Sequence, residues 1–263
     1  MKKLKTFAIG MILAAAGLLF YCGSFYIKSY RQNETAKENW KKVDDIAHTS
    51  EQTSEERDGK QQKRKEKIRE SFGISWDNLR KINSRVVAWI NIPGTNISYP
   101  VVQGEDDEFY LRHNFEDQED LFGCIFLGKI NKKNFKDSHS FLYGHNMEGH
   151  MMFADLNCYE SQEFLLKCPE FEIITPSRKY IYKIFSVEQA AEGSAAFEYG
   201  YELSGPEYRK QLEILKKSSL YDTGIAPRKD RPVVTLITCN SRLDQKIRMA
   251  VHGNLFKTLY YNR

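Results

Sequence analysis

The most constraining feature of this sequence is an apolar, β-branched run that ends on a cysteine, Arg231-Pro-Val-Val-Thr-Leu-Ile-Thr-Cys-Asn240. Valine, isoleucine and threonine favour extended backbone, so the run predicts a buried strand with Cys239 at a sheet edge. After the polar segment 240–245, an alternating run resumes at Lys246-Ile-Arg-Met-Ala-Val-His-Gly253. The two runs predict an antiparallel hairpin in which Arg248 lies roughly opposite Cys239, with cross-strand Cβ atoms about 5 Å apart.

A second apolar run, Phe141-Leu-Tyr-Gly-His145-Asn-Met, ends on a histidine that directly follows a glycine. A free cysteine is often a small buried hydrophobe, and a lone histidine is usually structural. A histidine and a cysteine that both close strands favour chemistry instead, because an imidazole is the usual proton partner of a nucleophilic thiol. The pattern therefore makes His145 a candidate base for Cys239.

The other histidines are weaker candidates for this role. His252 lies four residues beyond Arg248 on the same predicted strand face, which places it about 13 Å farther along at 3.3 Å per residue. The remaining histidines are expected to be structural or peripheral, with His150 as the main rival to His145: His48, His113, His139 and His150. The sequence shows no persuasive Asp or Glu to complete a papain-like triad.

Several stretches together resemble a known family. Thr235-Leu-Ile-Thr-Cys239 resembles the TLxTC signature of sortases, followed nine residues later by Arg248 and preceded upstream by Gly144-His145. The likeness is to class B sortases in particular and runs from about Phe72 to the C-terminus. Further matching stretches are Trp89-Ile-Asn-Ile-Pro-Gly-Thr-Asn-Ile-Ser-Tyr-Pro-Val-Val-Gln103, Tyr110-Leu111, Gly123-Cys-Ile-Phe126 and Tyr143-Gly-His-Asn-Met147, with Met152-Phe153 and Leu156 after the last.

The resemblance implies a mainly β fold: a closed antiparallel β-barrel of about eight strands with peripheral helices. These would include an N-terminal helix and a helix at 206–220, before the cysteine strand. The short apolar runs punctuated by glycine and proline predict by themselves only a β-rich domain with helices. Further strands are expected at 86–90, 171–175 and 180–187.

The resemblance also implies the activity, that of a cysteine transpeptidase. Such an enzyme cleaves a C-terminal sorting motif of secreted proteins through a thioacyl-enzyme and passes the acyl group to an amine. The amine belongs to a peptidoglycan cross-bridge or stem peptide, or to a pilin lysine, in a Gram-positive cell. Catalysis is expected from His145, Cys239 and Arg248, and substrate binding from Ile237, Thr238 and Asn240. No cofactor or metal is expected.

Two other functions stay open from the sequence. A hydrolytic Cys-His peptidase would form the same acyl-enzyme, but an added amine would not divert its product. A non-catalytic module that binds the cell wall through the barrel groove would form no acyl-enzyme. These differences in product give the experiments that separate the three functions.

The N-terminal quarter predicts a membrane protein. Residues 1–6 carry Lys2, Lys3 and Lys5, and residues 7–27 are uncharged and mostly apolar over about 20 residues, enough for a helix to cross a bilayer. We expect a cytoplasmic tail, a single-pass anchor, a charged tether or helical linker at 28–70, and an extracellular catalytic domain at 71–263. A cleaved signal peptide ending near Ala14-Ala-Ala16 is the competing interpretation, but the apolar run continues past that point.

Charge and cysteines limit the partners further. The net charge is +4, and the basic residues crowd the N-terminal quarter, which favours contact with a membrane surface over nucleic acid. Outside the cell, cysteines commonly pair. Cys124, Cys158, Cys168 and Cys239 match no metal motif in their spacing, and a paired Cys239 is no nucleophile. We expect mostly free thiols, with pairing of Cys158 and Cys168 left open.

Overall fold

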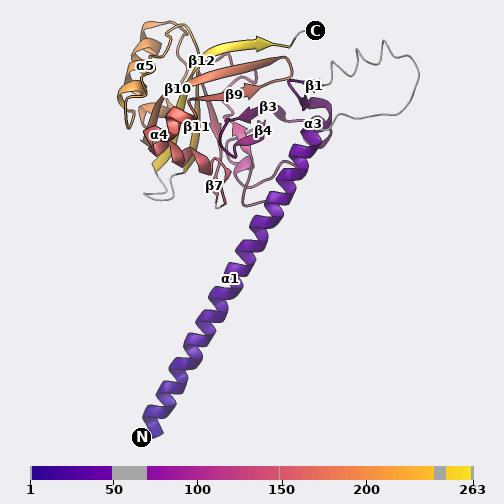
Figure 1. Cartoon of the computed structure of the whole chain (residues 1–263), viewed down its shortest axis with the longest axis vertical. Coiled ribbons are helices and arrows are strands. Elements are labelled where there is room, and N and C mark those ends of the chain that lie inside the picture. The colour runs from indigo at the N-terminus through magenta and orange to yellow at the C-terminus, as the bar shows by residue number, and fades with distance from the viewer. Residues whose placement is uncertain (1, 49–69, 148, 240–246, 262–263) are drawn as a thin grey trace, which may run out of the picture. The chain divides into compact units, whose positions relative to one another are not determined.

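The computed structural model describes the backbone of residues 2–48, 70–147, 149–239 and 247–261 (Figure 1). Within these ranges, the side chains of 2–14, 70–71 and 239 are outside the description. The chain divides into two compact units, Met1–Lys42 and Val43–Arg263. The second unit contains all the strands and the candidate catalytic residues.

Helix α1 (Lys2–His48) begins in the first unit and ends in the second. Within the second unit, Val43 and Ala47 are buried, and the His48 ring meets the Trp89 ring edge-on at 5.5 Å between centroids. Among the described residues, no helix combines the length and the apolar character that crossing a membrane requires. The anchor at 7–27 and the domain limits stay predictions.

Eight strands close into a barrel (Figure 1). In their order around the barrel they are β10 (Arg178–Ala191), β12 (Ile247–Tyr260), β11 (Val233–Cys239), β6 (His139–Tyr143), β5 (Ile125–Leu127), β4 (Ser98–Val102), β3 (Val86–Asn91) and β9 (Glu170–Ile174). Most of their apolar side chains are buried, so the barrel encloses a packed core. The closed eight-stranded barrel expected from the resemblance is confirmed.

The expectation that the barrel is antiparallel throughout is wrong. β6 pairs with β11, and β4 with β5, in parallel, whereas the other neighbours are antiparallel. A parallel pair needs a crossover connection, and both connections here are long. The chain between β6 and β11 contains two other barrel strands, and residues 103–124 join β4 to β5 through the 3₁₀ turn η1 (Phe109–Leu111).

Helices and short hairpins surround the barrel. Helix α5 (Pro206–Lys217), the helix expected before the cysteine strand, packs Tyr208, Leu212 and Leu215 against Phe185 and Val233 of the barrel wall. The remaining elements are β1 (Glu70–Ser71), β2 (Ile74–Ser75), α3 (Trp76–Ile82), β7 (Asn146–Met147), β8 (Met151–Met152), η2 (Ala154–Glu160), α4 (Gln162–Lys167) and η3 (Ala195–Phe197).

A line of buried polar side chains crosses four neighbouring barrel strands, β10, β12, β11 and β6. Glu188 Oε1 lies 2.9 Å from His252 Nε2, and His252 Nδ1 lies 2.8 Å from Thr235 Oγ1. Thr235 Oγ1 lies 2.6 Å from His139 Nε2, and His139 Nδ1 lies 2.9 Å from the Glu198 carbonyl oxygen. Each strand therefore contributes one member to a continuous hydrogen-bonded line.

The direction of each bond in this line follows from His139. Burial, with His252 nearby, lowers the pKa of His139 to about 3, so the ring is neutral at physiological pH. Its Nδ1–H donates to the Glu198 carbonyl, and its Nε2 must accept the Thr235 hydroxyl proton. Thr235 Oγ1 then accepts a hydrogen bond from His252 Nδ1–H. The hydrogen bond between His252 Nε2 and Glu188 Oε1 uses one further proton, which lies between these two atoms.

We expect the free energy of unfolding to fall as the pH is lowered from about 6.5 towards 3. The unfolded chain binds a proton at His139 near its ordinary pKa of about 6.5, whereas the folded chain does not until about pH 3. This residue alone contributes a slope of at most about 1.4 kcal/mol per pH unit. Urea unfolding at pH 7 and 5.5 measures it, and His139→Gln should show a flatter dependence. Equal slopes in the two proteins contradict the prediction.

Candidate active site

Cys239 is the last residue of β11, and Arg248 lies across from it on β12. The antiparallel register pairs Thr235 with His252, Ile237 with Ala250 and Cys239 with Arg248. The hairpin register expected from the sequence is therefore confirmed, although the connecting residues 240–246 are outside the described range. The pairing places Arg248 and Cys239 at the same end of the barrel wall.

On its other edge β11 lies beside β6, whose chain continues to His145. The parallel register pairs Val233 with His139 and Ile237 with Tyr143, and the Gly144 N–H donates to the Ile237 carbonyl at 3.1 Å. The paired register ends there, and His145 follows Tyr143 by two residues, as Cys239 follows Ile237. β12 and β6 flank β11, with Arg248 paired with Cys239 and His145 two residues beyond the end of β6.

The ring of His145 is fixed by a backbone carbonyl. Its Nε2 lies 2.7 Å from the Leu111 oxygen, and because a carbonyl only accepts, Nε2 carries the proton. In the neutral ring, Nδ1 is then the atom with a free lone pair. The His145 carbonyl accepts the Phe153 N–H at 2.9 Å, so the backbone of this residue is held as well.

Gly144 allows this arrangement because its surroundings leave no room for a side chain. An added Cβ would overlap Ile125 Cδ1 and lie 2.9 Å from Phe153 Cδ2. The glycine before His145 therefore lets the chain pass closely between the barrel core and the segment that follows β8. This explains physically why the residue before the histidine is a glycine.

Tyr143 is a site residue that the sequence analysis did not single out. Burial is the main cause that raises its pKa to about 12, the negative charge of Asp107 adds to this, and Arg248 opposes it. Its ring stacks on Phe126 with centroids 5.3 Å apart. A protonated phenol thus lies in the field of Arg248, which is itself half-buried. The sequence feature that could have identified Tyr143 as a site residue is its position two residues before His145.

The other histidines are engaged elsewhere. His150 Nδ1 lies 2.6 Å from Asp155 Oδ1 on a ring that is 70% exposed, and Asp155 also accepts the Asn96 N–H. His139 and His252 belong to the buried line below the site, as described above. His113 stacks on Phe109 with ring centroids 3.9 Å apart. The long separation predicted between His252 and Cys239 agrees with the observed pairing of His252 with Thr235.

The three residues expected to bind substrate are placed as follows. Ile237 and Thr238 are 2% and 1% exposed, and the Thr238 hydroxyl is buried with no hydrogen-bond partner among the described residues. Asn240 lies outside the described residues. Their role in substrate binding stays a prediction.

The cysteines with described side chains are free thiols, and these include Cys158 and Cys168, whose pairing the sequence left open. Burial raises the pKa of Cys124 well above its usual value, with smaller contributions from Asp117 and Asp120. Cys124 is therefore a protonated core residue. Within the described part of the chain, His, Cys, Asp and Glu side chains form no group that would hold a metal ion.

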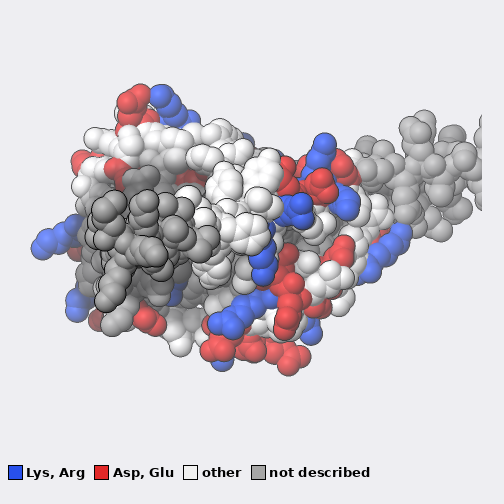
Figure 2. Space-filling model, turned by 90° about the horizontal axis from the view of Figure 1, so that it is seen from below, with Lys and Arg blue, Asp and Glu red and all other residues white. Residues whose placement is uncertain are grey.

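Surface charge is mixed on the face shown in Figure 2. Lys and Arg side chains lie among Asp and Glu side chains, with uncharged side chains between them. Pairs such as Lys179–Glu172 at 3.1 Å link neighbouring strands. Among the described residues visible on this face, neither sign of charge dominates.

Comparisons with known proteins agree on one family. Residues 90–256 match the family model described as the sortase domain. The chain is 34% identical over 183 residues to Sortase B of Listeria monocytogenes, an alignment that covers 68% of this chain and 72% of the relative. It is 29% identical over 190 residues to Sortase B of Staphylococcus aureus, with 72% and 75% covered.

A solved structure of similar fold is the X-ray structure of Clostridium perfringens sortase B. It matches with a TM-score of 0.64 and 32% sequence identity, and the alignment covers 69% of this chain and 99% of that chain. The matched portion of this chain therefore spans almost the whole of that structure.

We expect Gly144→Ala to destabilise the fold by about 1–3 kcal/mol, because the added methyl group must displace Ile125 or the Phe153 ring. Gly128→Ala is the matched control, since its Cβ would meet neighbours at 3.3 Å that a small shift relieves. Urea unfolding of both variants measures the difference. An unchanged unfolding midpoint in Gly144→Ala would show that the site has more room than the structure gives it.

Proposed function

This chain belongs to the sortase family of cysteine transpeptidases, and from that premise we propose that Cys239, His145 and Arg248 form its catalytic centre. The observation that carries the proposal is the strand register. β12 and β6 flank β11, which pairs Arg248 with Cys239 and supports a position for His145, two residues beyond β6, on the other side of the cysteine strand. A base and a fixed cation beside a cysteine are what acyl transfer through a thiol requires.

The first half of the reaction forms a thioacyl-enzyme. The Cys239 thiolate attacks the carbonyl carbon of the scissile peptide, and an electron pair of the C=O bond moves onto the oxygen. When the tetrahedral intermediate collapses, the C–N bond breaks and the leaving amine takes a proton from the His145 imidazolium. Nδ1 is the donor in this proposal, since the Leu111 carbonyl holds the Nε2 proton.

The second half transfers the acyl group. An incoming amine attacks the thioester carbon and gives a proton to the neutral His145 ring. The C–S bond then breaks, which releases the amide product and restores the thiolate of Cys239. One proton leaves and one returns at the same nitrogen, so the enzyme ends in its starting state.

Arg248 would stabilise the oxyanion of both tetrahedral intermediates. Its guanidinium is charged at all relevant pH values and presents its donors in a rigid fork, which suits an oxygen that gains charge in the transition state. The cross-strand pairing with Cys239 and its influence on the Tyr143 hydroxyl support this position. The same cation would also favour the thiolate form of Cys239.

The proposed donor substrate is a secreted protein with a sorting motif near its C-terminus. The proposed acceptor is an amine of a peptidoglycan cross-bridge or stem peptide, or a pilin lysine. We place the enzyme at the surface of a Gram-positive cell, with residues 7–27 as the anchor. The support for that placement is the uncharged stretch behind Lys2, Lys3 and Lys5 in the sequence.

We expect Cys239→Ala to fold but to form no acyl-enzyme. Intact-mass spectra after incubation with a library of sorting-motif peptides measure the adduct. Cys158→Ala, which removes a half-buried thiol in η2, is the control and should keep the adduct. Excess amine should convert the adduct to an amide, whereas a hydrolytic peptidase would release only acid. An adduct that persists in Cys239→Ala refutes the assignment.

We expect Arg248→Lys to lower turnover by a factor of roughly 10² to 10³, because lysine keeps the charge but not the two fixed donors. The rate of thiol alkylation by a small reagent should change little. Arg228→Lys, an exposed arginine paired with Asp230, is the control and should retain full turnover. If Arg248→Lys turns over at the wild-type rate, charge alone explains the residue.

A further inference from the structure

The segment 109–112, which carries the carbonyl that holds His145, is itself held at each of its carbonyl groups. Four consecutive backbone oxygens accept hydrogen bonds from groups outside the turn or at its end. The donors are His113 Nδ1 to Phe109 at 2.8 Å, the Cys124 N–H to Tyr110 at 2.9 Å, His145 Nε2 to Leu111 at 2.7 Å and the Asp120 N–H to Arg112 at 2.8 Å. Of these four, only the bond to Leu111 involves a proposed catalytic residue.

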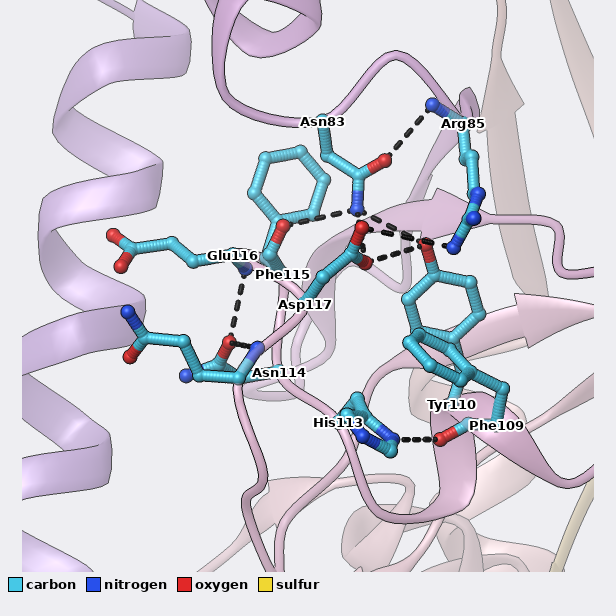
Figure 3. A network of polar contacts seen from close by, with 10 residues as sticks. Asn83, Arg85, Phe109, Tyr110, His113, Asn114, Phe115, Glu116 and Asp117 are labelled. Carbon is cyan, nitrogen blue, oxygen red and sulfur yellow. Dashed lines mark hydrogen bonds and ion pairs between the residues drawn. The ribbon is translucent and has the colours of Figure 1, made fainter.

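The Tyr110 side chain of the same segment joins a partly buried polar cluster, shown in Figure 3. The Tyr110 hydroxyl donates to Asp117 Oδ1 at 2.9 Å and accepts from Asn83 Nδ2 at 3.0 Å. Asn83 Nδ2 also donates to the Phe115 carbonyl at 3.0 Å. Asn83 Oδ1 accepts the Arg85 N–H at 2.8 Å, so both ends of this amide are bonded.

The cluster joins parts of the chain that are far apart in sequence. Asn83 follows α3 and precedes β3, whereas Tyr110 lies in η1 and Asp117 in the loop beyond it. Asn83 is 4% exposed and Tyr110 is 1% exposed, so the cluster is shielded from water at its centre. Burial, with Asp117 adding to it and Asn83 opposing it, raises the pKa of Tyr110 and keeps its hydroxyl a donor.

Arg85 closes the cluster on its outer side. Its guanidinium lies 3.6 Å from Asp117 Oδ2 and 5.4 Å from the centroid of the Phe109 ring, above which it sits. The pair with Asp117 is about two-fifths exposed, so it is weak alone. Arg85 therefore contacts both Asp117 and Phe109, the residue directly before Tyr110.

On the opposite side of the turn the backbone of 123–124 approaches closely. Gly123 has φ of +57°, and a Cβ there would overlap the Tyr110 carbonyl oxygen and lie 3.0 Å from that of Leu111. The turn is therefore held between a partly buried side-chain cluster and a close backbone contact. Neither the cluster nor the glycine touches the proposed reacting atoms.

We propose that Asn83, Tyr110 and Asp117 are positioning residues that hold the 109–112 turn so that the Leu111 carbonyl fixes His145 in its Nε2–H tautomer. This rests on the proposed role of His145 as the proton donor and acceptor. With the turn in place, Nδ1 is the ring nitrogen that exchanges a proton with the leaving and incoming amines. Without it, the ring is free to rotate and to carry its proton on either nitrogen.

Tyr110→Phe tests the proposal with the smallest change, the loss of one oxygen atom. It leaves Asp117 without its tyrosine donor and removes one acceptor from Asn83. We expect kcat to fall by about tenfold, the effect of losing a hydrogen bond to a charged group, with KM within a factor of about two. ¹⁵N NMR of the neutral His145 ring, assigned with His145→Gln, should show a mixture of two tautomers. One carries its proton on Nε2, as in the parent protein, and the other carries it on Nδ1.

The matched control is Tyr180→Phe, because Tyr180 is also buried and its hydroxyl donates to a backbone carbonyl, that of Asn134, at 3.1 Å. It should leave both kcat and the tautomer unchanged. Asp117→Asn keeps the shape of the cluster and removes its charge, so it should show the same changes to a smaller extent. It also serves as the test if Tyr110→Phe fails to fold.

The two readouts separate the inference from the function on which it rests. A shifted tautomer with lower kcat supports both. A shifted tautomer with unchanged kcat supports the positioning role and contradicts the proposed role of His145. An unchanged tautomer in a folded Tyr110→Phe or Asp117→Asn variant overturns the positioning role, whatever happens to kcat.

Discussion

The parallel pairing of β6 with β11 is the interaction on which the candidate active site depends. It joins residues 139–143 to residues 233–237, segments that lie more than 90 positions apart in the chain. Parallel strands that pair in register end at the same edge of a sheet, so the residues that follow them meet there. For this reason the chain that continues from β6 to His145 leaves the same end of the barrel wall at which β11 ends on Cys239, while the antiparallel return of β12 pairs Arg248 with Cys239.

The register of that pairing is fixed by the buried polar line from Glu188 to His139. Each of the four strands supplies one member, and the members are hydrogen-bonded to their neighbours. A slip of one residue in any strand would turn its member to the opposite face and leave the others buried without partners, which costs far more than an apolar mismatch. Thr235 lies four residues before Cys239, His139 lies six before His145, and His252 lies four after Arg248. The buried polar side chains therefore fix how these strands align, and this alignment sets the positions of the residues at the strand ends.

The ring of His145, the proposed base, is held by groups that take no part in the proposed reaction. His145 depends on the Leu111 carbonyl, Leu111 lies in a turn fixed by Tyr110, and Tyr110 is bonded to Asn83 and Asp117. The links are hydrogen bonds of 2.7 to 3.0 Å, buried at Asn83 and Tyr110 and part-buried at His145 and Asp117, and each opposes displacement of the next group. Gly144 adds a steric constraint directly before the histidine.

The sequence by itself determined the local parts of this protein: the hairpin that pairs Cys239 with Arg248, the helix before the cysteine strand and the run that ends on His145. These follow from periodicity and short loops, which act between residues near in the chain. The family resemblance supplied the barrel and the choice of His145. Only the tertiary structure decided that β6 and β11 run parallel, that Leu111 holds the His145 ring and that Asn83 meets Asp117. Those contacts join residues that are 34 or more positions apart, and one of them uses a backbone carbonyl, so they leave no periodic trace in the sequence.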